Sequence, residues 1–173
     1  MYFVSELGHC DLFDYVKNQR YTSTTTAYDF TLQAATALAW LHDEGYVHRD
    51  IKMENFILFP RNRLKLIDFE FSVYCGRKQF VETTLRAGTK PFLAPEVFKQ
   101  YKDDTLQTYK FYYVSDCYAF AKSFILIKHI MEHRFKNKFH EMILEPLLRD
   151  QPCYRTNMKY IKNKLKFCIE NEL

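Results

Sequence analysis

Glycine is scarce in this chain, with four residues in 173. Their positions allow no G-x-G-x-x-G pattern, which excludes a glycine-rich phosphate-binding loop within the sequence. No apolar run reaches the roughly 18 residues that a transmembrane helix needs, so no membrane partner is expected. The first residues, MYFVSELGHCDLF, lack the basic and cleavage regions of a signal peptide.

Cysteine is also sparse, and the five cysteines include no C-x-x-C pair. An odd, scattered set predicts reduced thiols and therefore a cytoplasmic or nuclear location. The net charge is only +4, which is small for a nucleic-acid footprint, so no nucleic-acid partner is expected. With 47% hydrophobic and 17% aromatic residues, the chain can still build the core of about one domain.

The periodicity of apolar residues predicts a mainly α fold with short β hairpins. The clearest helix covers 26–43, where Phe30, Ala34 and Leu38 share one face and Gly45 follows as a stop signal. Two apolar runs, 56–59 and 64–67, predict a hairpin. We also expect a strand within 1–7, a helical turn at 11–17, a long loop at 70–96, and helices at 115–131, 138–148 and 157–169.

Four motifs then follow in order: YVHRDIKMEN at 46–55, LIDFE at 66–70, GTKPFLAPE at 88–96 and SDCYAFA at 115–121. Together they resemble the C-terminal lobe of eukaryotic Ser/Thr protein kinases over nearly the whole chain. The family pattern H-R-D-L-x-x-x-N is matched with Ile51 in place of Leu. D-F-G is matched with Glu70 in the third place. Lys52, two residues after Asp50, is the Ser/Thr type.

The resemblance implies a phosphoryl-transfer site that uses ATP, Mg²⁺ and a protein substrate. Asp50 would accept the proton of the substrate hydroxyl, and Lys52 would lie near the transferred phosphate. Asn55 and Asp68 would hold magnesium, which takes one or two carboxylates together with phosphate oxygens.

The resemblance also places the nucleotide. Glu6 and Leu7, with Ser5, would form the hinge segment against which the adenine lies. Asp11 would bond the ribose, and Ile57 would form the apolar floor under the adenine.

Other residues are expected to support this site. Asp116 would anchor the backbone of the catalytic loop, and Glu96 would form a buried ion pair with Arg155. Arg49, beside the catalytic Asp50, suggests control by phosphorylation of Thr83 or Thr84.

The family's glycine-rich loop and its strand lysine with a partner glutamate have no match here. We therefore interpret 1–173 as a partial kinase domain, the hinge strand plus the C-terminal lobe, and expect little activity from the isolated chain. The alternative is a truncated, pseudokinase-like protein that docks on and regulates another kinase through an apolar surface around Tyr2, Phe3 and Val4.

The segment 129–133 spells the zinc-protease pattern H-x-x-E-H. The kinase resemblance already accounts for this segment and no third ligand is evident, so no zinc site is expected.

Overall fold

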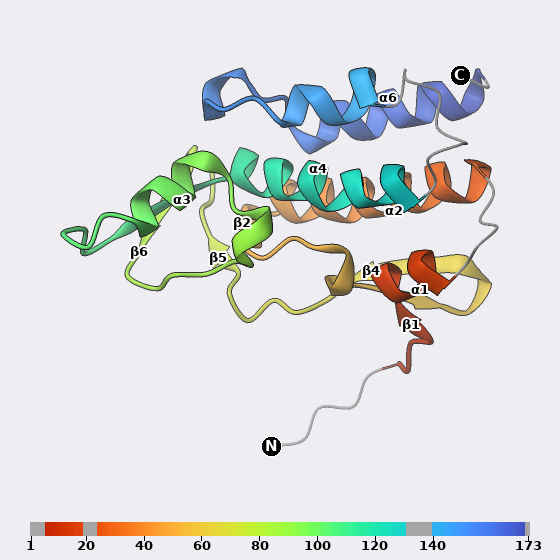
Figure 1. Ribbon diagram of the computed structural model, residues 1–173, viewed down its shortest axis with the longest axis horizontal. Helices are drawn as coiled ribbons and strands as arrows, with labels where there is room; N and C mark the ends of the chain where they lie inside the picture. The colour runs from red at the N-terminus through yellow and green to blue at the C-terminus, as the bar shows by residue number, and fades with distance from the viewer. Residues whose placement is uncertain (1–5, 19–23, 131–139, 172–173) are drawn as a thin grey trace.

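The computed structural model describes residues 6–18, 24–130 and 140–171 in three layers (Figure 1). The middle layer holds α2 (Thr24–Asp43) and α4 (Tyr113–Ile130). In Figure 1, α6 (Met158–Glu170) lies above them, and a β hairpin with α1 (Leu12–Asn18) lies below. The expected helices at 26–43, 115–131 and 157–169 are confirmed within a few residues.

The long helix α2 is buried on the face that the sequence predicted. Phe30, Ala34 and Leu38 are each at most 1% exposed. α6 packs on α2 through its own apolar face, which includes Ile161 and Leu165, both fully buried. Burial of the whole side chain stabilises each such residue by about 1.5–3 kcal/mol.

A three-stranded antiparallel sheet has the order β1-β3-β4, with β1 at Cys10–Asp11, β3 at Phe56–Phe59 and β4 at Arg63–Leu66. The predicted hairpin is confirmed, and its turn passes through Arg61 and Asn62 with positive φ. The expected strand at 1–7 centres on residues outside the described part of the chain, and the described Glu6 and Leu7 lie in no strand. Residues 1–5, including Tyr2, Phe3 and Val4, lie outside the described residues.

The segment 70–96 is more ordered than predicted. Within it, β5 (Val73–Tyr74) pairs with β2 (Tyr46–Val47), and β6 (Phe80–Thr83) pairs with β7 (Tyr109–Tyr112). The helix α3 (Pro95–Tyr101) begins with the proline of the A-P-E match, as is common at a first helical position. Because both strand partners lie far away in sequence, local periodicity could not reveal them.

The predicted helix at 138–148 is wrong in its described part. A π turn at His140–Leu144 is followed by a 3₁₀ turn at Glu145–Leu147. Pro146 lacks the backbone N–H that an α-helix needs there. Further 3₁₀ turns occupy Met53–Asn55, Pro60–Asn62, Lys90–Phe92 and Pro152–Tyr154.

Across residues 6–18, 24–130 and 140–171, no helix is long and apolar enough to cross a bilayer. The same residues contain no group of three His, Cys, Asp or Glu side chains that could hold a metal ion. The H-x-x-E-H pattern itself includes Glu132 and His133, which lie outside the described residues.

The described side chains form two hydrophobic clusters. The larger joins α1, α2, α4, α6 and the hairpin, and includes Phe56 and Phe124. The smaller lies where the 70–96 segment meets β7, and consists of Val47, Cys75, Ala87, Ala94, Val97, Tyr109 and Phe111. The catalytic-loop motif runs between the two clusters.

Candidate active site

The loop that begins at His48 is held in place by α4. The Asp116 carboxylate accepts the backbone N–H of His48 at 2.7 Å and that of Arg49 at 2.9 Å. Asp116 is 2% exposed, so both bonds lie away from water. They hold Arg49 at a φ of 74°, a left-handed backbone conformation that is uncommon for a residue with a side chain. The expected anchoring role of Asp116 is confirmed.

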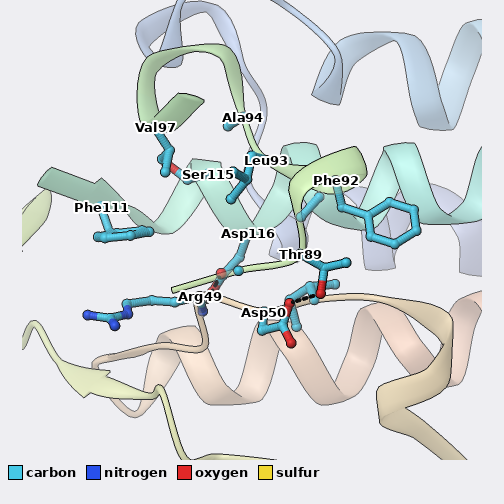
Figure 2. Close-up of a pocket in the computed structure, with 13 residues that line it drawn as sticks. Arg49, Asp50, Thr89, Phe92, Leu93, Ala94, Val97, Phe111, Ser115 and Asp116 are labelled. Carbon is cyan, nitrogen blue, oxygen red and sulfur yellow. Dashed lines mark hydrogen bonds between the residues drawn. The ribbon is translucent and has the colours of Figure 1, made fainter. Parts of the chain in front are cut away.

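Asp50, Lys52 and Thr89 form a closed triangle of polar contacts (Figure 2 shows the Asp50–Thr89 bond). Lys52 Nζ lies 2.9 Å from Asp50 Oδ2, and Thr89 Oγ1 donates to Asp50 Oδ1 at 2.7 Å. Lys52 Nζ also lies 3.0 Å from Thr89 Oγ1. Asp50 is only 6% exposed, so its carboxylate has one preferred orientation. Sequence reasoning gave Thr89 no role, although it lies inside the GTKPFLAPE motif.

Gly88 explains how Thr89 reaches Asp50. Its φ is 101°, and a Cβ at this position would lie 2.8 Å from the backbone oxygen of Arg49. Only glycine allows the segment before α3 to approach the catalytic loop this closely. The glycine of this motif therefore sets the distance between the two loops.

The proposed magnesium ligands stand at adjacent ends of the hairpin. Asn55 precedes β3, Asp68 follows β4, and the N–H of Ile67 donates to the backbone oxygen of Asn55 at 2.9 Å. The Asn55 side-chain amide donates to the Asp50 carbonyl at 2.8 Å, which orients its Oδ1 relative to the loop. A carboxylate and an amide oxygen are hard ligands of the kind Mg²⁺ prefers, so the donor set fits this ion.

Glu70 stands where the family pattern D-F-G has glycine, and its backbone shows no strain. Asp68 has a φ of 63°, whereas Glu70 is not among the described non-glycine residues with positive φ. His48 Nε2 lies 3.0 Å from the Ile67 carbonyl, and its ring contacts Phe69 edge to face at 5.4 Å. Phe69 nevertheless remains 49% exposed.

The expected nucleotide-side residues are partly brought together. Asp11 in β1 stands opposite Ile57 in β3, so the proposed ribose ligand and adenine floor are neighbours. Gly8 packs on Ile57 so closely that any Cβ would clash with its Cγ2. Asp11 Oδ1 also accepts the N–H of Asp14 at 2.8 Å and so caps α1.

The hinge candidates Glu6 and Leu7 precede this pair in the chain and make different contacts. Leu7 is 88% exposed. The Glu6 carboxylate contacts Arg63 and Lys65 of β4, and the bond to Lys65 lowers the pKa of Glu6. Sequence reasoning did not foresee this ion pair, because its partners lie almost 60 positions away.

The expected ion pair between Glu96 and Arg155 is confirmed, with bidentate bonds of 2.7 and 2.6 Å. The Arg155 side chain is fully buried. It also donates to the backbone oxygens of Val114, Arg149 and Asp150. The pair therefore joins α3 to the start of α4 and to the segment before α6.

Two hollows differ in size and place. The pocket beside Asp50 in Figure 2 has a volume of about 20 Å³, room for about one water. A hollow of about 670 Å³ lies between α2, β4 and Lys166, with Trp40 and Phe69 on its wall. That volume is typical of ligand sites. None of the expected site residues lines this hollow, however.

These features define a rigidly held loop with its supporting contacts, and comparison with known proteins identifies the family. The model of the protein kinase domain family matches residues 1–112. The chain therefore belongs to the protein kinase domain family. It is similar to Ser/Thr kinases in particular, as the resemblance in the sequence predicted.

Three curated relatives illustrate the match. An Aurora kinase of Debaryomyces hansenii is 34% identical over 105 residues, 60% of this chain and 26% of that protein. Protein kinase C-like 1 of Saccharomyces cerevisiae is 29% identical over 164 residues, 91% of this chain and 13% of its own length. Serine/threonine-protein kinase ppk16 of Schizosaccharomyces pombe is 36% identical over 94 residues, 53% of this chain and 14% of the relative. The chain thus spans about a quarter or less of these proteins.

Proposed function

We propose that this chain is the catalytic C-terminal lobe of an ATP-dependent protein Ser/Thr kinase. The observation that carries the proposal is the triangle of Asp50, Lys52 and Thr89, formed by residues at the family's motif positions. In this triangle the buried Asp50 carboxylate lies beside the Lys52 ammonium, on a loop that Asp116 anchors. Phosphoryl transfer depends on such positioning and charge stabilisation more than on covalent chemistry by the protein.

The roles of the triangle follow from its contacts. Asp50 orients the hydroxyl of a substrate serine or threonine and takes its proton. Lys52, held at 2.9 Å from Asp50, supplies positive charge next to the transferred phosphate. Thr89 holds the Asp50 carboxylate in one rotamer by its hydrogen bond.

Asn55 and Asp68 would hold Mg²⁺ beside the nucleotide. When bound, the ion neutralises phosphate charge. Asp11 and Ile57, which face one another across β1 and β3, would bind the ribose and the adenine. Glu6 and Leu7 remain the hinge prediction, and Glu6 would have to exchange its contacts with Arg63 and Lys65 for this role.

We assign the described residues to the hinge side and the C-terminal lobe, with the glycine-rich lid and strand lysine supplied by another segment or chain. The 173 residues contain no glycine-rich loop, and phosphate lids contribute much of the electrostatic stabilisation in phosphoryl transfer. All five cysteines are free thiols, which supports a reducing location such as the cytoplasm or nucleus.

A fusion tests the proposed activity. The N-terminal lobe of a Ser/Thr kinase, such as the Aurora relative, is placed before residue 6, and transfer of the ATP γ-phosphate to a Ser-containing peptide is measured. Asp50→Asn should lower the rate by about 10²–10⁴-fold, the usual contribution of a general base. Asp43→Asn, at the exposed end of α2, is the matched control and should leave the rate unchanged. Equal rates for Asp50→Asn and the parent fusion would refute the assignment.

The second candidate function is docking on another kinase. The observation that favours it is the hollow beside exposed Trp40 and Phe69, at 62% and 49% exposure. Apolar surface of this kind usually marks an interaction site. Co-purification with a kinase that requires Trp40, without peptide phosphorylation by the fusion, would favour docking over catalysis.

A further inference from the structure

The segment between α3 and α4 has a feature that the motifs do not explain. Residues 102–112 bring β7 back against β6, so that Phe80, Val81, Glu82 and Thr83 pair in register with Tyr112, Phe111, Lys110 and Tyr109. The exposed Lys110 also contacts Glu82 at 3.2 Å. The middle of the 70–96 segment is thus bound into a ladder by residues that follow it in the chain.

The ladder is itself tied to α3. The Gln100 side chain accepts the Lys110 N–H at 2.6 Å and donates to the Lys110 carbonyl at 3.0 Å. The backbone N–H and carbonyl of Lys110 thus both bond to α3. β7 is therefore held on one side by β6 and on the other by α3. Strand pairs gain stability when a third element packs against them.

Tyr101 holds the loop at a second point, the backbone of Ala87, which lies two residues before Thr89. Its hydroxyl accepts the Ala87 N–H at 2.6 Å and donates to the Ala87 carbonyl at 2.7 Å. Burial raises the pKa of Tyr101, so the hydroxyl keeps the proton that the second bond requires. One side chain therefore satisfies both backbone groups of a residue that is 5% exposed.

Two arginines stack on aromatic rings of the same segment. The Arg49 guanidinium lies 4.6 Å from the centre of the Phe111 ring and donates to the Leu85 carbonyl (Figure 2 shows Arg49 reaching toward Phe111). Arg86 lies over Tyr101 and Tyr109, and its Nε donates to the Tyr109 hydroxyl at 2.8 Å. Arg86 also lies 3.5 Å from the Asp104 carboxylate, and the cation–π contacts add to the attraction that holds both arginines on these rings.

We propose that residues 99–112, which we call the clamp segment, hold the 80–89 loop in the conformation that brings Thr89 to Asp50 without phosphate on that loop. The clamp segment supplies the strand partner of β6, both bonds to Ala87 and the aromatic faces for Arg49 and Arg86. Its relevance to catalysis rests on the proposed function, because Thr89 acts through Asp50.

The competing account is phosphate dependence. Arg49 Nε and Nη1 are buried and have no hydrogen-bond partner among the described residues, so they could receive a phosphate from Thr83 or Thr84. The two accounts differ in the state of the loop before phosphorylation. The clamp segment requires an ordered loop in the unmodified chain, whereas phosphate dependence requires a disordered one.

Amide hydrogen exchange on the 173-residue chain separates them. The chain is made in bacteria, checked by mass to carry no phosphate, and measured without nucleotide. We expect protected amides in β6 and at Ala87. Tyr101→Phe should speed exchange at Ala87 by about tenfold or more, because it leaves a buried N–H and carbonyl unpaired. The amides of Gly88 and Thr89 should also exchange faster, while the exchange rates of the α2 amides should stay unchanged.

Two further variants keep the test decisive. Gln100→Ala should loosen β6 through β7, and Tyr154→Phe, at a tyrosine that is 70% exposed, should change no rate in the 80–89 loop. Exchange of the β6 and Ala87 amides at the speed of unstructured peptide in the parent chain would overturn the proposal. So would protection that arises only after phosphorylation of Thr83 or Thr84. The result is independent of the Asp50→Asn assay, since no phosphoryl transfer is measured.

Discussion

The two sides of the catalytic loop differ in how completely this chain builds them. On the substrate side, Asp50, Asp116 and Arg155 are all at most 7% exposed and each is bonded within the chain. On the nucleotide side, Leu7 and Phe69 are 88% and 49% exposed. The proposed substrate side is stabilised by its own buried polar contacts, whereas the proposed nucleotide side has exposed apolar side chains.

This contrast has an energetic meaning. Buried polar groups are costly when unpaired, so carboxylates that are paired within one lobe, as those of Asp50, Glu96 and Asp116 are, keep their geometry without a further partner. Exposed apolar groups favour association with a covering surface. Kinase chemistry needs both sides, which is why a complete catalytic loop alone does not imply an active chain.

The largest effect should come from the ion pair of the substrate side. Arg155→Ala removes the only charged partner of the mostly buried Glu96 carboxylate among the described residues, leaving it the Ser115 hydroxyl, and should lower the free energy of unfolding by about 3–5 kcal/mol. Urea unfolding followed by circular dichroism measures this. Arg149→Ala is the control, since its pair with Glu145 is exposed and is worth about 0.3–0.5 kcal/mol. Equal losses of unfolding free energy in the two variants would show that the buried pair stabilises the fold no more than an exposed pair does.

A smaller loss is expected from the anchor of the loop. Asp116→Ala removes the carboxylate that accepts the buried N–H groups of His48 and Arg49, for a loss of about 3 kcal/mol. Asp43→Ala, at an exposed carboxylate, should stay within about 0.5 kcal/mol of the parent chain. The same unfolding experiment checks both, and a loss below 1 kcal/mol for Asp116→Ala would contradict the anchoring role.

The smallest effect should come from the exposed wall of the hollow between α2 and β4. Trp40→Ser and Phe69→Ser should each change the free energy of unfolding of this chain by no more than about 0.5 kcal/mol, because both side chains are largely exposed. Phe124→Ala is the contrasting variant: this side chain is fully buried, and its loss should cost about 3–5 kcal/mol. A large loss at Trp40 would mean that the wall of the hollow is part of the core, and would contradict its description as exposed surface.

The sequence predicted the parts of the structure that depend on local pattern or on a known motif. Helical periodicity located α2, and the two apolar runs located the hairpin of β3 and β4. The motif positions of Asp116, Glu96 and Arg155 predicted contacts across more than 50 positions, which periodicity could not have done. The roles of Asp50, Lys52, Asn55 and Asp68 remain predictions supported by their placement.

The parts that were missed depend on contacts that have no local signal. The pairing of β6 with β7 and the bonds of Tyr101 to Ala87 arise only when distant segments pack together. Thr89 lay inside a recognised motif, yet its bond to Asp50 required the close approach that Gly88 permits. The contact of Glu6 with Arg63 and Lys65 likewise depends on how the first residues lie across β4.

The most direct test of the contrast is phosphoryl transfer by the chain with and without a glycine-rich lobe. The 173-residue chain and the fusion described above are given ATP, Mg²⁺ and the same peptide, and incorporation of the γ-phosphate is measured. We predict transfer by the fusion, abolished by Asp50→Asn, and none above background by the isolated chain. Transfer by the isolated chain that Asp50→Asn abolishes would contradict the account, as would a folded fusion that transfers no phosphate.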